Sequence, residues 1–212
     1  MSDHDEAADA ATAEKATERL SFFSDAVIAI AITLLAIELP VPTGDTSEQI
    51  IASFFEISGE YLTFLISFLV IANHWMAHHR LFRFVNRSDG AVMRLNILWL
   101  LLIVLNPFLT KVLNEGSIGL ARFSLYAVAQ AVQVLIYAAM VALIARRGWF
   151  TANAPRSFRE RGYLPTVYLA IGFLVSVPAF ILIHSWAYAI WALLPNLLGF
   201  IGRRAGLAKA RP

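Results

Sequence analysis

Long apolar stretches recur along the chain, and each can cross the hydrocarbon core of a bilayer, which needs roughly 17 to 25 residues. Backbone N–H and C=O groups in lipid must find partners inside the segment, so helices are expected here and strands are not. The stretches run from Leu20 to Leu39, Tyr61 to His79, Val92 to Val112, Ser124 to Ala145, Tyr163 to Ile183 and Ser185 to Ile201. The sequence therefore predicts an all-α polytopic membrane protein with six transmembrane helices, one six-helix repeat per subunit.

Composition argues against a soluble enzyme. Hydrophobic residues make up 58% of the chain and charged residues 15%, against about 45–50% and about 25% in soluble domains. The sequence has no Cys, which excludes disulfides and thiolate metal sites. It also lacks a Gly-rich phosphate loop and a nucleophile elbow, so we expect neither enzyme activity nor a bound cofactor.

The distribution of basic residues predicts the topology. With six spans, both termini lie on one side of the membrane. Of the 17 Lys and Arg residues, only Lys111 and Arg122 then fall on the opposite side. The positive-inside rule places both termini in the cytoplasm, and we expect the cell inner membrane as the location. Topology accounts for the loop arginines and the formal net charge is only +2, so no nucleic-acid partner is expected.

The ends of the chain differ from the apolar middle. Residues 1–17 are rich in Ala, Asp, Glu and Thr and are expected to form a mobile cytoplasmic tail. This acidic leader also argues against a cleaved signal peptide, whose leader is basic. Residues 18–203 form the predicted six-helix transmembrane domain, and residues 204–212 a short basic cytoplasmic tail.

One face of the first predicted helix carries a row of apolar side chains. A helical wheel at about 100° per residue places Ile30, Leu34 and Ile37 on this face, stacked over about 10 Å. If several copies of the helix surrounded an axis, these side chains would form apolar rings that close a pore by excluding water. The alternative, that the row faces lipid or other protein, stays open from the wheel alone.

Asp25 is an ionisable residue within the first span. An unpaired carboxylate at the centre of a membrane helix costs about 2.5–3.5 kcal/mol on insertion scales, so Asp25 needs partners. The candidates at the same depth are Trp75, His78, His79, Arg94, Asn96 and Arg19. With the Ser24 hydroxyl, they predict a polar network that ties the first three helices together. The network is interpreted either as a structural clamp or as a proton-responsive switch.

Two histidines share a helix face. His74 and His78 are spaced i, i+4 and raise the question of zinc. No third ligand is evident, so hydrogen-bonding roles are favoured and no metal site is predicted. Gln130 and Gln133 are expected to join helices.

Two features mark the outer side of the first two spans. Glu38, near the outer end of the first, is interpreted as a solvated end residue in preference to a cation-attracting one. Thr46 and Gln49 form a capping-box pattern, which predicts a helix beginning near Ser47.

The first half of the chain carries several motifs of one known family. The motif R-L-S-F-F-S-D, from Arg19 to Asp25, resembles the R-x-x-x-F-S-D signature of the transmembrane protein 175 family of potassium channels. Further similar segments are H-W-M-A-H-H-R-L-F (His74 to Phe82), L-N-I-L-W-L (Leu95 to Leu100) and N-P-F (Asn106 to Phe108). The resemblance covers the first three helices, while the last three agree only in number and hydrophobicity.

The resemblance implies specific roles for individual residues. A bacterial member has a single six-helix repeat and forms a homotetramer whose pore is lined by the first helix. The apolar constriction falls on Ile30, Leu34 and Ile37, and a threonine layer linked to potassium preference falls on Thr33. The supporting polar network falls on Arg19, Phe23, Ser24, Asp25, Trp75 and His78, with Asn96 as a weaker match.

The permeant ion is expected to be potassium, with modest preference. Ile and Leu offer no oxygen to replace an ion's water shell, and the sequence lacks a T-V-G-Y-G filter. Thr33 adds a hydroxyl, but we expect it to bond the Ala29 carbonyl and to present its methyl group. The predicted partners are further copies of the chain, membrane lipid and potassium ions. The alternative functions are a proton-coupled secondary transporter that uses Asp25 and His78, and a non-conducting membrane scaffold.

Overall fold

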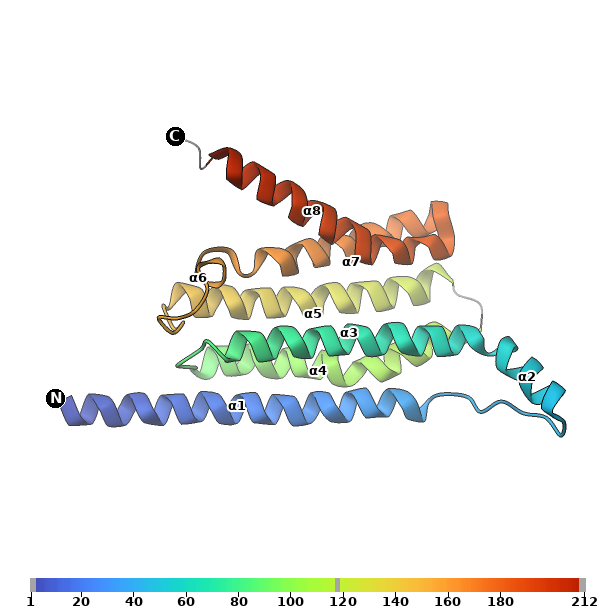
Figure 1. Ribbon diagram of the computed structural model, residues 1–212, viewed down its shortest axis with the longest axis horizontal. Helices are drawn as coiled ribbons and strands as arrows, with labels where there is room; N and C mark the ends of the chain where they lie inside the picture. Colours follow the sequence, from blue (N-terminus) through green and yellow to red (C-terminus); the bar gives the residue numbers. More distant parts are fainter. Residues whose placement is uncertain (1–2, 117–118, 210–212) are drawn as a thin grey trace.

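The computed structural model describes residues 3–116 and 119–209, and the regular elements within them are helices (Figure 1). In chain order they are α1 (Asp3–Ile37), α2 (Ser47–Glu56), α3 (Ser58–Phe82), α4 (Gly90–Asn114), α5 (Leu120–Arg146), α6 (Arg156–Arg161), α7 (Leu164–Ile183), the 3₁₀ turn η1 (His184–Ala187) and α8 (Tyr188–Lys209). The prediction of an all-α protein is confirmed.

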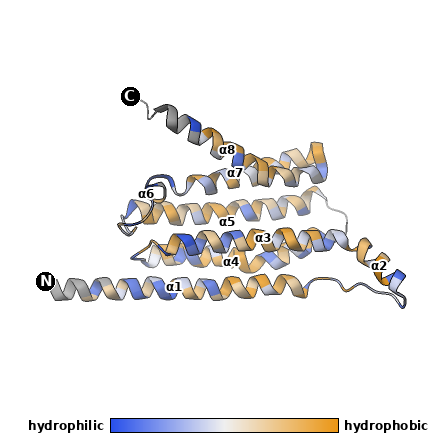
Figure 2. Ribbon diagram, in the orientation of Figure 1, coloured by the Kyte–Doolittle hydropathy of each residue, from blue (hydrophilic) through white to orange (hydrophobic). Residues whose placement is uncertain are grey.

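Five of these helices are long and apolar enough to cross a membrane: α3, α4, α5, α7 and the Ala11–Ile37 part of α1. They coincide with the first five predicted spans. Tyr188–Gly202 in α8, at the sixth predicted span, is apolar but shorter. Figure 2 shows hydrophobic residues along the middle of the bundle helices, with hydrophilic residues gathered around α6 and the first half of α1.

The predicted start of α2 is confirmed by its cap. The Thr46 side chain accepts a hydrogen bond from the Gln49 backbone N–H at 3.3 Å, and the Gln49 side chain accepts one from the Thr46 N–H at 3.2 Å. This reciprocal pairing satisfies backbone donors that a helix start leaves free. The helix ends at Glu56, and α3 starts at Ser58, so α2 projects beyond the bundle as a separate segment (Figure 1).

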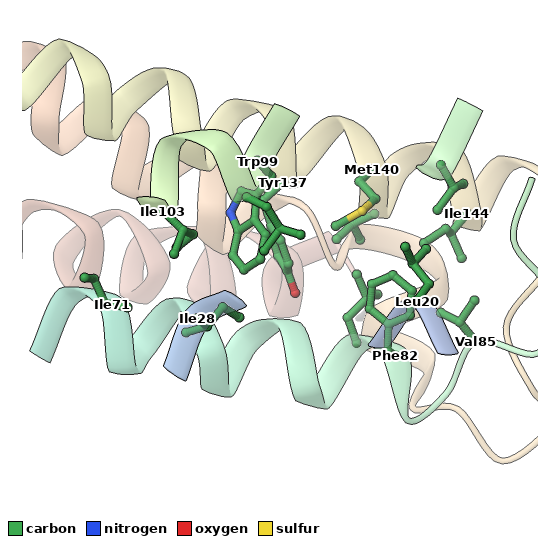
Figure 3. Packing of buried hydrophobic residues seen from close by; sticks show 14 of the residues in the cluster. Leu20, Ile28, Ile71, Phe82, Val85, Trp99, Ile103, Tyr137, Met140 and Ile144 are labelled. Carbon is green, nitrogen blue, oxygen red and sulfur yellow. The ribbon is translucent and has the colours of Figure 1, made fainter. Parts of the chain in front are cut away.

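The long helices pack as neighbours in a row. Helix α1 packs against α3 and α4, α4 against α5, α5 against α7, and α7 against α8. One buried cluster joins α1, α3, α4 and α5 around Trp99, and Figure 3 shows its packing with Ile28, Tyr137 and Met140. A second joins α4, α5, α7 and α8 around Phe123 and Trp191. The side chains of α1 therefore meet only the first half of the bundle core.

The described parts of both predicted tails belong to long helices. Residues 1–17 are helical from Asp3 onward, continuous with the span, and residues 1–2 lie outside the described part. Helix α8 continues to Lys209, which takes in most of the predicted basic tail, while residues 210–212 lie outside the described part. The mobility of residues 1–17 and the cytoplasmic location of both tails stay predictions.

Candidate functional site

Helix α1 buries one face against its own subunit. The buried residues recur every three or four positions, which is the spacing of one helix face: Thr17, Leu20, Ser24, Ile28, Ala31 and Leu35. Ile28 and Leu35 are only 1% and 3% exposed. These contacts with α3 and α4 fix the rotation of α1 about its axis and so decide which side chains face outward.

The opposite face of α1 leaves large apolar side chains uncovered. Ile30 is 61% exposed, Leu34 39% and Ile37 75%, and the three lie along about 10 Å of helix. The row predicted from the wheel therefore does not pack into its own bundle. In one copy of the chain, this face is available either to lipid or to other subunits.

Thr33 lies on the exposed face as well. Its hydroxyl donates to the Ile30 carbonyl at 2.8 Å, so the expected acceptor, Ala29, is wrong by one residue. The two acceptors correspond to the two side-chain rotamers that a helical Thr uses to reach back along its own helix. The consequence is the same, because the hydroxyl hydrogen is held by the helix backbone.

A buried chain of hydrogen bonds joins α1, α4 and α3. The Asn96 Nδ2 donates to Ser24 Oγ at 2.9 Å, and Asn96 Oδ1 lies 2.9 Å from His78 Nε2. Ser24 Oγ in turn donates to the Leu20 carbonyl at 2.8 Å. All three linked side chains are fully buried, so they fix the contact of α1 with its neighbours at one level.

The bonding pattern assigns the donor nitrogen of His78. Asn96 Oδ1 can only accept, so His78 Nε2 carries the hydrogen and donates. The other ring nitrogen, Nδ1, is buried without a hydrogen-bond partner among the described residues. The imidazole is held between the Phe82 and Trp99 rings, with centroids 4.4 and 4.9 Å away. A second proton would place a buried N–H with no acceptor, which is costly.

Asp25 lies beside this chain and has a different partner. The Trp75 indole N–H donates to Asp25 Oδ1 at 2.9 Å, and the His79 ring stacks on Trp75 at 5.5 Å. The structure thus brings Asp25 to Trp75, and Ser24 to Asn96 and His78, as two adjacent contacts between α1 and its neighbours.

The remaining predicted members of the network are placed outside these contacts. Arg19, Phe23 and Arg94 are exposed, and within residues 3–116 and 119–209 no hydrogen bond or ion pair of the two arginine side chains is found. Their inclusion in the network stays a prediction.

A second polar network lies deeper in the bundle. Asn106 donates to Gln133 Oε1 at 3.1 Å and accepts from Gln130 Nε2, and Gln130 Oε1 lies 3.4 Å from His74 Nε2. The expectation that Gln130 and Gln133 join helices is confirmed. His74 and His78 are occupied by hydrogen bonds on different partners, and no cluster of three metal-ligating side chains is found in the described part of the chain.

An ion pair lies directly after the C-terminal end of α1. Lys111 Nζ of α4 lies 2.8 Å from Glu38 Oε2, with both side chains about half exposed. Glu38, interpreted from sequence as merely solvated, therefore has a cationic partner directly after the apolar row.

Comparisons with known proteins decide the family. The family model described as the endosomal/lysosomal potassium channel TMEM175 matches residues 19–107. A protein of Streptomyces collinus named a potassium channel is 34% identical over 185 residues, which cover 79% of this chain and 87% of that protein. This chain belongs to the TMEM175 family.

Two further comparisons lead to Chamaesiphon minutus. A protein named a potassium channel is 43% identical over 101 residues, which cover 47% of this chain and half of that protein. The crystal structure described as a lysosomal potassium-selective channel TMEM175 homolog superposes with a TM-score of 0.73 at 26% identity, covering 88% of this chain and 97% of that one. The TMEM175 fold therefore extends well beyond the residues that the family model matches.

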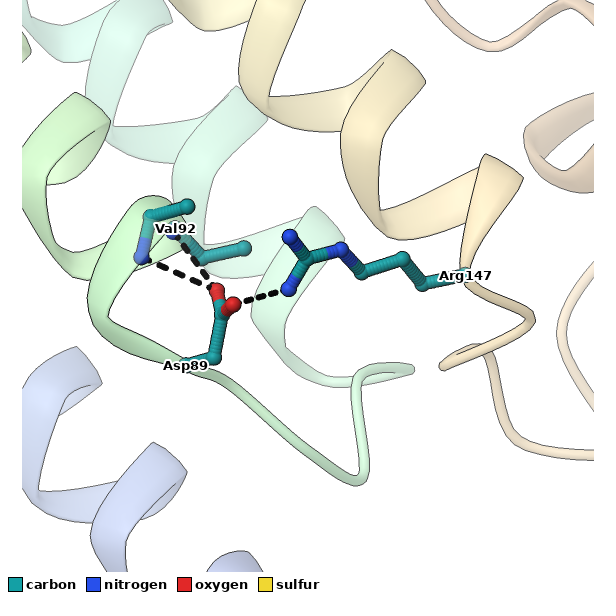
Figure 4. A network of polar contacts seen from close by, with 4 residues as sticks. Asp89, Val92 and Arg147 are labelled. Carbon is teal, nitrogen blue, oxygen red and sulfur yellow. Dashed lines mark hydrogen bonds and ion pairs between the residues drawn. The ribbon is translucent and has the colours of Figure 1, made fainter.

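A contact in the α3–α4 loop completes the site, and the sequence analysis did not predict it. Asp89 in the α3–α4 loop accepts from the Ala91 and Val92 backbone N–H groups at 3.0 Å and pairs with Arg147 at the end of α5 (Figure 4). The Val92 N–H and the Arg147 guanidinium hold the Asp89 pKa below its ordinary value. The adjacent Ser88 hydroxyl lies 3.0 Å from that of Thr17 in α1.

These loop contacts form one connected unit, which we call the loop clasp: Thr17, Val85, Ser88, Asp89, Arg147 and Phe150. Val85 and Phe150 pair as an isolated antiparallel bridge. Only the N-cap pattern of Asp89 before the α4 helix offers a local sequence signal for it. Thr17, Arg147 and Phe150 lie outside the residues that the family model matches, and the clasp connects α5 to the base of α1 through the α3–α4 loop.

Proposed function

We propose that the chain is one subunit of a homotetrameric, potassium-preferring cation channel. In this proposal residues 18–203 form six transmembrane helices, α8 supplies the sixth, and both termini are cytoplasmic at the cell inner membrane. The α1 helices surround the pore, with Ile30, Leu34 and Ile37 as the constriction and Thr33 as a layer that contributes to potassium preference. Relatives named potassium channels support the choice of ion.

The uncovered apolar face of α1 carries the proposal. Within a subunit, α1 lies at the side of the bundle and turns Ile30, Leu34 and Ile37 away from α3 and α4. Four such faces around an axis make three successive apolar rings. Rings of this kind block hydrated ions by dewetting and conduct when they widen.

The polar contacts behind α1 support a positioning role. Ser24, Asn96 and His78 hold the helix on the side opposite the constriction, and the loop clasp holds its base. A ring of side chains closes a pore only when each helix is fixed in rotation. We therefore infer that the network acts as a clamp and not as a proton-responsive switch, because a second proton on His78 Nδ1 would find no acceptor among the described residues.

Ion flux from liposomes tests the proposal. Wild-type protein is expected to pass potassium down its gradient without a proton gradient. Ile30→Asn is expected to increase this flux, because the amide wets the apolar ring. Ile181→Asn is a matched control: Ile181 on α7 is also 61% exposed, but α7 does not line the proposed pore.

The outcomes separate the alternatives. Flux that requires a proton gradient would indicate a coupled transporter that uses Asp25 and His78, and no flux from any variant would indicate a scaffold. Equal flux from Ile30→Asn and wild type, or an equal rise in Ile181→Asn, would contradict the pore assignment.

A further inference from the structure

A long crevice separates α3 from the α5, α7 and α8 side of the bundle. It has a volume of about 510 Å³. Its α3 wall runs from Ile66 to Ala77, about 16 Å at 1.5 Å per residue. All of this wall lies within helices that cross the membrane or within the apolar part of α8, so the surroundings of the crevice are hydrocarbon.

The crevice walls leave little for a polar ligand to bind. Asn73 donates to the Leu69 carbonyl at 2.8 Å, and the Tyr137 hydroxyl donates to the Ala77 carbonyl at 2.7 Å. His74 is held by Gln130. Three polar side chains of the wall therefore already have partners within the protein, and most of the remaining wall is apolar, with Phe173 and Trp191 among it. Such a cavity favours an apolar occupant over water.

One end of the crevice is basic. On α3, Asn73, Ala77 and Arg80 follow each other at spacings of four and three, so Arg80 continues the crevice face by one turn. Tyr137, which lines the crevice, donates to the carbonyl of Ala77, three residues before Arg80, and the Arg80 side chain is exposed. The Arg80 guanidinium at this end can pair with the anionic headgroup of a lipid whose acyl chain lies along the wall.

We propose that this crevice binds an anionic phospholipid, with an acyl chain between α3 and the α5–α7–α8 side and the phosphate at Arg80. An unfilled space of this size would deprive its lining of packing contacts, and the tail of a neighbouring lipid is the apolar group at hand. The inference requires that the chain spans a membrane but not that it conducts ions.

Native mass spectrometry of the full chain in mild detergent, with phosphatidylglycerol or phosphatidylcholine added, tests this proposal. Wild-type protein is expected to retain phosphatidylglycerol in preference. Ala192→Phe fills the crevice from α8 and is expected to reduce bound phosphatidylglycerol to background. Arg80→Gln is expected to weaken it about fivefold, since one basic side chain near anionic lipid contributes about 1 kcal/mol.

Matched variants make the test selective. Ala189→Phe is the control for Ala192→Phe, because Ala189 lines a different hollow of α8. Arg83→Gln is the control for Arg80→Gln, because Arg83 lines a hollow between α1 and α3. Both controls are expected to keep wild-type lipid binding, and elution volume on size exclusion confirms that every variant folds.

Two outcomes would overturn the proposal. The first is unchanged phosphatidylglycerol in Ala192→Phe. The second is a loss of subunit association in Ala192→Phe with the lipid count unchanged, which would assign the crevice to a second copy of the chain. Neither measurement involves ion flux, so a failure here leaves the proposed channel function untouched, and the reverse also holds.

Discussion

At the scale of single residues, Asn96 uses both ends of its amide to connect helices. Its nitrogen donates to Ser24 of α1 and its oxygen accepts from His78 of α3. At this fully buried position, a replacement side chain needs both a donor and an acceptor to keep the two hydrogen bonds. Asp25 is the charged residue of the first predicted span, but among the described residues its one hydrogen-bond partner is Trp75.

Asn96→Ala is expected to destabilise the protein. The substitution leaves the buried His78 Nε2–H without an acceptor, which costs about 1–3 kcal/mol in free energy of unfolding. Thermal unfolding in detergent measures the change. Asn196→Ala is the control, because Asn196 is exposed and bonds only the Ala192 carbonyl of its own helix at 2.7 Å. A similar loss in both variants would show that the buried chain contributes nothing specific.

The residue-level predictions from sequence succeed where geometry is local. Helix periodicity places Ile30, Leu34 and Ile37 together, because their relation depends only on one helix. The choice between Ala29 and Ile30 as acceptor of Thr33 depends on a side-chain rotamer, which the sequence does not encode. Likewise, depth alone brings Asp25 near several candidates, and only the rotation of each helix selects Trp75 over Asn96 as its partner.

At the scale of elements, the start of α4 is held by one side chain that serves two purposes. Asp89 caps the helix through the Ala91 and Val92 N–H groups and also binds Arg147 of α5. A loop that joins two spans is thereby attached to the end of a third. Because the loop also contacts Thr17 of α1, it connects the end of α5 to the base of the proposed pore helix.

Loss of the Asp89 cap is expected to weaken this end of the bundle. Asp89→Ala removes the acceptor for the first turn of α4, which typically costs about 0.5–2 kcal/mol. Asp89→Asn keeps a capping oxygen and loses only the ion pair, so its loss of stability is expected to be smaller. Unfolding of both variants in detergent measures the order, and an Asn variant as unstable as the Ala variant would contradict it.

The Asp89 contribution is also expected to depend on pH. The folded-state pKa of Asp89 is lowered from 3.8 by the Val92 N–H and the Arg147 pairing, so the carboxylate is stabilising above that value. The advantage disappears as pH falls below 3.8 through the folded pKa. Melting temperatures of wild type and Asp89→Asn should therefore differ at neutral pH and converge in acid. A constant difference down to pH 3 would assign it to something other than the charge.

At the scale of the whole molecule, the sequence predicts the spans better than their mutual packing. Hydropathy identifies the apolar helices because each helix in lipid forms its own backbone hydrogen bonds and presents apolar side chains. The loop clasp depends on Val85 meeting Phe150 and on Asp89 meeting Arg147, which no local pattern indicates. The same holds for the crevice, whose walls come from helices far apart along the chain.

Assembly is the whole-molecule property on which the proposed pore depends. One copy of α1 cannot enclose a passage, so the protein in mild detergent is expected at four times the chain mass of 23.5 kDa. Light scattering coupled to size exclusion measures the protein mass without the detergent. A stable monomer would contradict the tetramer.

The charge at the outer end of that assembly is expected to set conductance at low salt. Lys111 pairs with Glu38 directly after the proposed constriction, so Lys111→Gln would leave an unpaired carboxylate in each subunit. Local cation concentration then rises, and single-channel potassium conductance is expected to increase in dilute electrolyte. The increase should vanish near 1 M salt, where the Debye length is about 3 Å. Adding Glu38→Gln should abolish it, because the field of the unpaired carboxylate is its cause. An increase that persists in the double variant, or at high salt, would place the effect of Lys111 in the packing of α4 against α1 and not in the electrostatics of the mouth.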